Sequence, residues 1–168
     1  MAQVRKTLNS ILNVLAGVSF IIMVVLTCWQ VFTRYILKNP SSWSEELVGY
    51  LFGWMALFGA SLVVGERGHM NIPVVIERFN MSVRKGFAIF GELVGLAFSA
   101  TILTYGGFQI ANLAMGQTTS SLGVAIGTFY WVMPICGILN VIYNILNIID
   151  ICNGTISLKT AEELEKEA

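Results

Sequence analysis

Charged residues are absent from three long stretches of this sequence, and that absence restricts the fold more than any other feature. No Asp, Glu, Lys, Arg or His occurs in residues 7–33, 47–65 or 93–149. A helix needs about 20 mostly apolar residues to cross the hydrocarbon core of a bilayer. The first two stretches each hold one such helix, and the third, which polar and Gly-rich sequence interrupts, holds two. The chain is therefore predicted to cross a membrane four times.

The expected fold is all-α, because every backbone N–H and C=O group inside hydrocarbon must be bonded within its own segment. The predicted helices cover residues 8–35, 44–64, 86–113 and 129–151. We expect residues 1–152 to form a four-helix transmembrane domain and residues 153–168 to form a short polar cytoplasmic tail. No internal repeat relates the first two spans to the last two, which argues against an inverted-repeat transporter that is complete in one chain.

The positions of the basic residues predict how the chain is oriented. Of its ten Lys and Arg residues, only Arg34 and Lys38 fall on one side of the membrane. Because Lys and Arg concentrate on the cytoplasmic side of membrane proteins, we expect both termini in the cytoplasm. The outer connections are then residues 36–43 and 114–128, and the inner connection is residues 66–85.

A short amphipathic helix is expected in the inner connection. Ile72, Val75, Ile76 and Phe79 follow i, i+3, i+4, i+7 spacing, which places them on one helix face. Pro73 suits the first turn of such a helix. We therefore predict an interfacial helix between the second and third spans, with its apolar face in the bilayer surface.

The first outer connection leads into a strong helix start. Ser42 and Glu45 have capping-box spacing. Alternatively Ser44 is the cap, and Glu45 and Glu46 lie in the first turn, close to the positive end of the helix. On either reading, capping alone accounts for these four residues.

The same connection also has the composition of a docking surface. Tyr35 and Trp43 are the aromatic types that gather at a membrane interface. Arg34 would then contribute to docking, or form an ion pair with one of the glutamates at positions 45 and 46. Capping and docking are both kept as hypotheses for this segment.

The remaining ionisable candidates lie toward the inner side. His69 is the only histidine, so it cannot form a bis-histidine haem site, and a structural hydrogen bond is its favoured role. Glu92 lies about two turns into the third span, where an acid is costly and marks a functional site by default. The alternative is that Glu92 stays near the inner interface and pairs with Lys85, with Arg67 or with a cation of a partner subunit.

Small and uncharged residues mark other features. Pairs of glycines with GxxxG spacing occur at residues 49/53, 91/95 and 123/127, and the first two pairs lie inside spans, where they permit close helix contact. The second outer connection carries no charge, so we expect it to pack on the membrane surface or against another protein. Pro134 is predicted to start or kink the fourth helix.

Several classes of function lack the residues that they need. The sequence contains no phosphate-binding loop, no HExxH and no G-x-S-x-G motif, so ATP hydrolysis by this chain and the common hydrolase chemistries are not expected. Its net charge is zero by formal count, which gives no basic surface for nucleic acid. Three cysteines without metal-ligand spacing are interpreted as packing residues, and no cofactor is expected.

The order of the motifs resembles the small integral membrane subunit of TRAP (tripartite ATP-independent periplasmic) transporters. The similarity covers most of the chain and rests on Val31-Phe-Thr-Arg34-Tyr35, Trp43-Ser-Glu45-Glu46-Leu47, Phe58-Gly59-Ala60, Arg67-Gly68-His69 and Ser121-Leu-Gly-Val-Ala-Ile-Gly-Thr-Phe-Tyr130. The chain departs from the family pattern after His69, where the family often has an acid and this sequence reads Met70-Asn71.

The resemblance implies a complex in a bacterial inner membrane. A large multi-span subunit would bind an organic acid (sialic acid, a C4-dicarboxylate or similar) and couple it to sodium, and a periplasmic substrate-binding protein would deliver it. The small subunit would brace the large one among the membrane lipids and help to form the periplasmic docking face. The candidate interaction residues are Arg34, Tyr35, Trp43, Glu45, Glu46, Arg67, His69 and Glu92.

Two other functions compete with this reading. The chain could act alone as a small four-helix transporter or channel, assembled as a homo-oligomer, for which Glu92 is the one membrane-embedded acid. It could also anchor a membrane enzyme or cytochrome, but its single histidine argues against that role.

Overall fold

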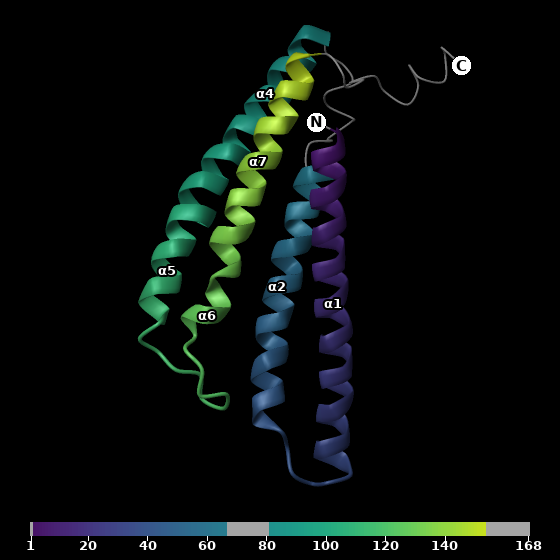
Figure 1. Ribbon diagram of the computed structural model, residues 1–168, viewed down its shortest axis with the longest axis vertical. Coiled ribbons are helices and arrows are strands. Elements are labelled where there is room, and N and C mark those ends of the chain that lie inside the picture. The colour runs from purple at the N-terminus through teal and green to yellow at the C-terminus, as the bar shows by residue number, and fades with distance from the viewer. Residues whose placement is uncertain (1, 67–80, 154–168) are drawn as a thin grey trace, which may run out of the picture.

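The computed structural model describes residues 2–66 and 81–153, and the regular elements in these residues are helices. The first hairpin consists of α1 (Ala2–Tyr35) and α2 (Ser42–Glu66). The third span runs from α4 (Met81–Phe98) through a π-helical segment, η1 (Ser99–Gly106), into α5 (Gly107–Ala114). The fourth consists of the single turn α6 (Gly127–Tyr130) and the long helix α7 (Val132–Cys152) (Figure 1).

Four helical segments are long and apolar enough to cross a membrane, which confirms the prediction of four spans. They are Gln3–Tyr35, Ser42–Glu66, Ser82–Ala114 and Gly127–Cys152. Each extends past the range expected from the charge-free stretches, because polar residues can continue a helix beyond the hydrocarbon. The expected interfacial helix falls mostly on residues 67–80, and the expected polar tail on residues 154–168, and both lie outside the described residues.

The four spans form two helical hairpins. α1 packs along α2, α7 packs along α4 and η1, and contact between α2 and α7 joins the two hairpins (Figure 1). α1 begins and α7 ends at the same end of the bundle, which we call the terminal end. The opposite end, with residues 36–41 and 115–126, is the connection end.

Few large side chains are buried in the described bundle. The core cluster consists of Leu12, Phe58, Val132, Cys136 and Tyr143. Bulky apolar residues instead cover the outside, and three on α1, Val14, Ile21 and Val25, are each more than 60% exposed. Such a surface would drive a water-soluble protein to aggregate, whereas lipid tails or partner helices cover it in a membrane.

Glycine allows the helices of the second hairpin to approach each other closely. A Cβ on Gly137 would lie 2.5 Å from Thr104 Oγ1 and 2.7 Å from the Thr104 backbone nitrogen, and one on Gly127 would collide with the Ala111 carbonyl oxygen. Close packing of this kind is how membrane helices associate without a hydrophobic driving force.

The glycine pairs predicted from sequence differ in what they contact. Gly95 packs against the Asn144 side chain, as expected for close helix contact, whereas a Cβ added at Gly49 or Gly53 would have no neighbouring atoms within 4 Å. Gly123 adopts a left-handed backbone with φ of +68° in the second connection, outside the helices. Pro134 is the third residue of α7, so it starts that helix, as predicted.

Candidate functional site at the connection end

Glu46 joins the two connections at the connection end. It lies in the first turns of α2, and its carboxylate accepts hydrogen bonds from the backbone N–H groups of Ser120, at 3.2 Å, and Ser121, at 2.9 Å. Hydrogen bonds to a charged acceptor are stronger than those between neutral groups. One side chain of the first hairpin therefore fixes the loop of the second hairpin beside it.

The second connection satisfies much of its own backbone. The Thr119 N–H donates to the Val124 carbonyl oxygen at 2.8 Å, and the Ile126 N–H donates to the Gln117 carbonyl oxygen at 2.9 Å. The Val124 N–H donates to the Thr119 hydroxyl at 3.0 Å. These bonds, together with Glu46, explain how an uncharged loop keeps a defined shape.

The start of α2 differs from both capping arrangements expected from the sequence. The helix begins at Ser42, so the residue before it is Ser41, whose carbonyl oxygen accepts the Glu45 N–H at 3.4 Å. The Ser44 hydroxyl lies 2.8 Å from both the carbonyl and the hydroxyl oxygen of Ser41. The predicted Ser42 and Ser44 caps are therefore wrong by one and three residues, because the Ser41 carbonyl oxygen already accepts the Glu45 N–H.

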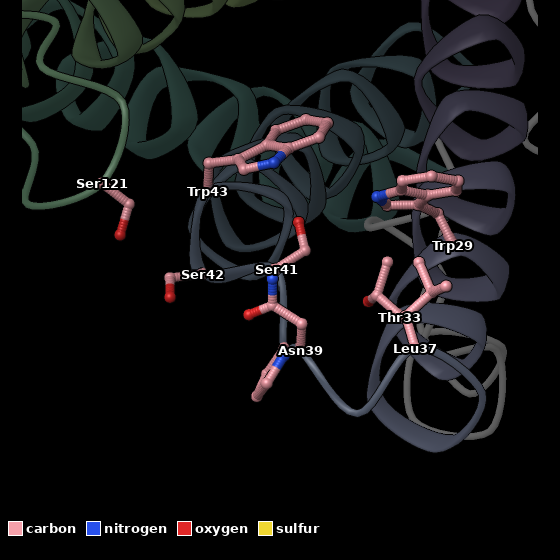
Figure 2. Close-up of a pocket in the computed structure, with 9 residues that line it drawn as sticks. Trp29, Thr33, Leu37, Asn39, Ser41, Ser42, Trp43 and Ser121 are labelled. Carbon is pink, nitrogen blue, oxygen red and sulfur yellow. The ribbon is translucent and has the colours of Figure 1, made fainter.

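A cavity of about 760 Å³ opens beside this helix start. Trp29 on α1 and Trp43 on α2 border it, and Ser121 reaches it from the second connection (Figure 2). The Ser41 hydroxyl points into the space between the two rings, and the Asn39 amide and the Ser42 hydroxyl lie below Trp43 in this view (Figure 2). The full lining comprises Trp29, Thr33, Leu37, Asn39, Pro40, Ser41, Ser42, Trp43 and Ser121.

The other predicted residues of this end are exposed. Tyr35 is 74% exposed and Trp43 is 43% exposed, while Arg34 and Glu45 also face outward. The predicted pair between Arg34 and a glutamate is not formed among the described residues, whereas Arg5 of α1 and Asp150 of α7 do form an ion pair. The aromatic and charged groups are thus available to a partner or to lipid.

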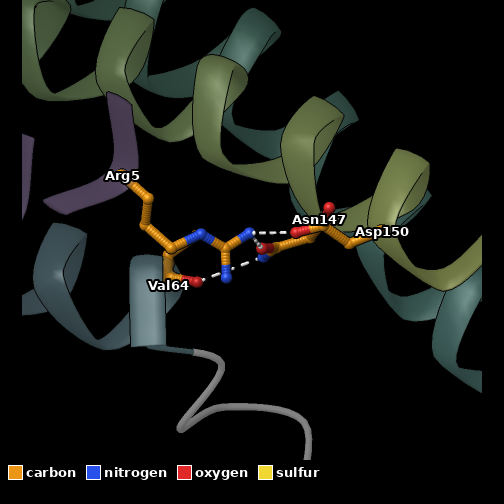
Figure 3. Close-up of polar contacts among 4 residues, drawn as sticks. All are labelled: Arg5, Val64, Asn147 and Asp150. Carbon is orange, nitrogen blue, oxygen red and sulfur yellow. Dashed lines mark hydrogen bonds and ion pairs between the residues drawn. The ribbon is translucent and has the colours of Figure 1, made fainter. Parts of the chain in front are cut away.

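A second polar site, at the terminal end, connects three helices. Arg5 Nη2 donates to Asn147 Oδ1 and to Asp150 Oδ2, each at 2.8 Å. Asn147 Nδ2 in turn donates to the Val64 carbonyl oxygen at the end of α2, at 3.2 Å (Figure 3). The first residues of α1 and the last turns of α2 and α7 are fastened together by this network.

Tyr143 adds another contact between the hairpins. Its hydroxyl donates to Asn9 Oδ1 at 2.6 Å, and its ring lies so close to Gly65 that a Cβ there would be 2.8 Å from it. Sequence reasoning missed this network. Its signal is a polar stripe in an apolar helix, since Asn140, Asn144 and Asn147 follow i, i+4, i+7 spacing and are all buried.

Of the inner-side candidates, Glu92 lies within the described residues, on α4. Glu92 is only 3% exposed and Arg84 is 8% exposed, so the structure buries both. Arg67 and His69 are outside the described residues. Within the residues that are described, no group of three His, Cys, Asp or Glu side chains could hold a metal ion.

Comparison with known proteins places this arrangement in a family. Residues 23–153 match the family model described as tripartite ATP-independent periplasmic transporters, DctQ component. The sialic acid TRAP transporter small permease protein SiaQ of Vibrio cholerae is 23% identical over 164 residues, which cover 98% of this chain and 94% of that protein.

Two further relatives match smaller parts of the chain. The C4-dicarboxylate TRAP transporter small permease protein DctQ of Rhodobacter capsulatus is 35% identical over 78 residues, which are 46% of this chain and 34% of that one. The sialic acid TRAP transporter permease protein SiaT of Haemophilus influenzae is 28% identical over 89 residues, which are 53% of this chain but only 14% of that protein.

The family match covers most of the chain and includes the last three spans and part of the first. It agrees with a multi-pass helical bundle whose described residues include four segments long and apolar enough to cross a membrane. The protein is a transport protein rather than an enzyme. The chain belongs to the DctQ family, the small permease subunits of tripartite ATP-independent periplasmic (TRAP) transporters.

Proposed function

We propose that this chain braces the large multi-span subunit of a TRAP transporter in a bacterial inner membrane and that its connection end forms part of the periplasmic docking face. The observation that carries the proposal is the pair of hydrogen bonds from Ser120 and Ser121 to Glu46, which makes one surface of the two connections. A periplasmic substrate-binding protein would meet that surface, with Arg34, Tyr35, Trp43 and Glu45 exposed on it.

The substrate is proposed to be an organic acid, carried by the large subunit with sodium. Relatives of this chain are named for sialic acid and for C4-dicarboxylates, and both substrates are carboxylates. The H. influenzae relative is called a permease protein, and the stretch that matches this chain is 14% of its length. That relative supports an arrangement in which a small-subunit segment works beside a much larger permease.

The described spans support a bracing role rather than transport by this chain alone. The charged side chains buried in residues 2–66 and 81–153 are Arg84 and Glu92, and both belong to α4. A pathway for an organic anion would need cationic or polar groups at the centre of the bundle. Of the buried asparagines of α7, Asn147 is bonded to α1 and α2, and the Asn144 amide donates to the Asn140 carbonyl oxygen within α7 itself.

The competing function is a self-sufficient homo-oligomeric transporter or channel. Its support is the buried Glu92 together with the apolar outer faces, which a second copy could cover. Reconstitution separates the two functions. Vesicles should receive this chain alone, the large subunit alone, or both, each with the binding protein and a sodium gradient.

We expect uptake of the organic acid only when both membrane subunits and the binding protein are present. Uptake by this chain alone would contradict the scaffold function and support the homo-oligomer.

The docking role is tested separately, with a variant of this chain in the same vesicles. Arg34→Ala should raise the concentration of binding protein that gives half-maximal uptake, whereas Lys6→Ala, an exposed cation at the terminal end, should not change it. Equal behaviour of the two variants would leave Arg34 without a docking role.

A further inference from the structure

The cavity between Trp29 and Trp43 combines polar and aromatic side chains in its lining, and two cations, Arg34 and Lys38, are next in sequence to residues that line it. We propose that it binds the phosphate-bearing head group of a bilayer phospholipid, whose acyl chains lie along α1. This inference rests on the membrane-spanning fold and not on the docking role proposed above.

The polar part of the cavity suits a phosphodiester. Hydroxyl groups of Ser41, Ser42 and Ser121 and the amide of Asn39 line it, and none of its nine lining residues is acidic (Figure 2). Hydroxyl, amide and indole N–H groups donate hydrogen bonds, and phosphate oxygens only accept them. The Glu46 carboxylate, which accepts the Ser121 N–H, is not among the residues that line the cavity.

Two cations flank this lining in the sequence. Arg34 follows the lining residue Thr33, and Lys38 lies between the lining residues Leu37 and Asn39. Both are exposed, and neither takes part in an ion pair within the described residues. Cations are depleted from this side of a membrane protein if it faces the periplasm, so two of them next in sequence to residues that line one cavity favour an anionic ligand there.

Lys38 also has an unusual backbone. Its φ is +52°, and it is the one non-glycine residue with a positive φ in the described chain. A residue with a Cβ adopts this left-handed conformation at a cost in conformational energy. Lys38 lies in the short turn between α1 and α2, between the lining residues Leu37 and Asn39, and backbone strain of this kind clusters at binding sites.

An apolar track leads from the cavity along α1. Val25, Trp29 and Phe32 have i, i+4, i+7 spacing and therefore share a face, and they are 62%, 44% and 42% exposed. The rings of Trp29 and Phe32 stack with centroids 5.9 Å apart. A ligand with its head in the cavity would lay an apolar tail on this face, which is the shape of a phospholipid and not of a free anion.

The test measures thermal unfolding of the purified full chain in detergent with three additives. Dioleoyl phosphatidylglycerol supplies head and tails, dioleoylglycerol supplies the same tails without phosphate, and inorganic phosphate supplies the anion alone. We expect a saturable rise in unfolding temperature with the phospholipid only, because a ligand that binds the folded state stabilises it. Native mass spectrometry should show one retained phospholipid.

An equal rise with dioleoylglycerol would show an apolar contact without a head-group site, and an equal rise with inorganic phosphate would show a simple anion site. Either result overturns the proposal, and both come from the unmodified chain. In a second arm, the double variant Arg34→Gln/Lys38→Gln should bind the phospholipid about tenfold more weakly, since it loses two cationic contacts.

The matched control is Lys6→Gln/Lys85→Gln, which removes two exposed cations from other parts of the bundle. It should retain the affinity of the unmodified chain. If both double variants lose affinity equally, the phospholipid binds through general surface charge, and the cavity is not its site.

Discussion

Gly137 lies where α7 crosses η1, and the neighbouring backbone leaves no room for a methyl group. A Cβ at this position would be 2.5 Å from Thr104 Oγ1, 2.7 Å from the Thr104 nitrogen and 2.9 Å from the Leu103 carbonyl carbon. A side chain could rotate away from such a contact, but backbone atoms of a packed helix cannot. The close approach of the third and fourth spans therefore depends on the absence of a side chain at this one residue.

Gly137→Ala should consequently lower the free energy of unfolding by about 1–3 kcal/mol, the usual cost of overpacking. The measurement is thermal or denaturant unfolding of the purified chain in detergent. Gly59→Ala is the matched control, because Gly59 lies in α2 and a Cβ added there would meet no atoms within 4 Å. A variant at residue 137 as stable as the one at residue 59 would show that the helices separate at little cost.

Single residues of the candidate site could be proposed from the sequence, but their partners could not. Glu46 was predicted as part of a capped helix start or a docking surface, whereas its hydrogen bonds go to a loop 74 and 75 residues further along the chain. Such a contact depends on how two hairpins pack, and no local pattern encodes it. The same holds for Arg5, which binds residues on α7 that are more than 140 positions away.

At the scale of elements, charge-free stretches predicted all four spans, because hydrocarbon admits few ionisable groups. The ends were predicted less well, since α1 extends back to Ala2 and α4 back to Met81 through charged residues that need not lie in hydrocarbon. The π-helical segment η1 has no sequence signal that we recognise. Within it the Thr104 hydroxyl donates to the Ser99 carbonyl oxygen at 2.8 Å, a bond that suits the wider helical turn.

Arg5 joins the start of α1 to the end of α7, so replacing Arg5 should weaken the contact between these two helices. Arg5→Gln removes the ion pair with Asp150 and weakens the bond to Asn147, and both Arg5 and Asp150 are less than a quarter exposed. Hydrogen bonds to charged groups contribute about 1.5–3 kcal/mol, and partial exposure reduces that contribution. We expect a loss of about 1–2 kcal/mol in the free energy of unfolding.

The control is Lys6→Gln, one residue further along α1 and exposed to the surroundings. Distance measurement between spin labels near the start of α1 and the end of α7 provides a second readout. The distance distribution should broaden in the Arg5 variant and stay narrow in the Lys6 variant. If the labels report the same narrow distances in both, apolar packing alone holds the two ends together.

At the scale of the whole molecule, polar contacts join the two hairpins at both ends of the bundle. The network of Arg5 and Asn147 lies at the terminal end, and Glu46 reaches the second loop at the connection end. Toward the same end, Trp54 Nε1 donates to the Phe129 carbonyl oxygen at 2.8 Å, and the rings of Tyr50 and Phe129 stack with centroids 4.1 Å apart. Contacts at both ends hold the two hairpins in one arrangement, as the proposed bracing role requires.

The orientation of this bundle decides which partner the connection end can meet, and the positions of the basic residues predict it. We expect the connection end in the periplasm, so a cysteine introduced as Ser42→Cys should react with a membrane-impermeant maleimide in intact cells. Ser82→Cys, at the start of the third span, should react only after the membrane is permeabilised. Both positions are exposed in the structure, so accessibility within the protein does not limit the reaction.

Both cysteines are introduced into a variant from which Cys28, Cys136 and Cys152 have been removed. Cys28 and Cys152 are exposed and would otherwise react with the maleimide. Labelling of residue 82 but not residue 42 in intact cells would show the opposite orientation, with the connection end in the cytoplasm. Membership of the family would stand, because it rests on the sequence match. The docking proposal would fail, since Glu46 and the surface it creates would then face the cytoplasm, where no periplasmic binding protein can reach them.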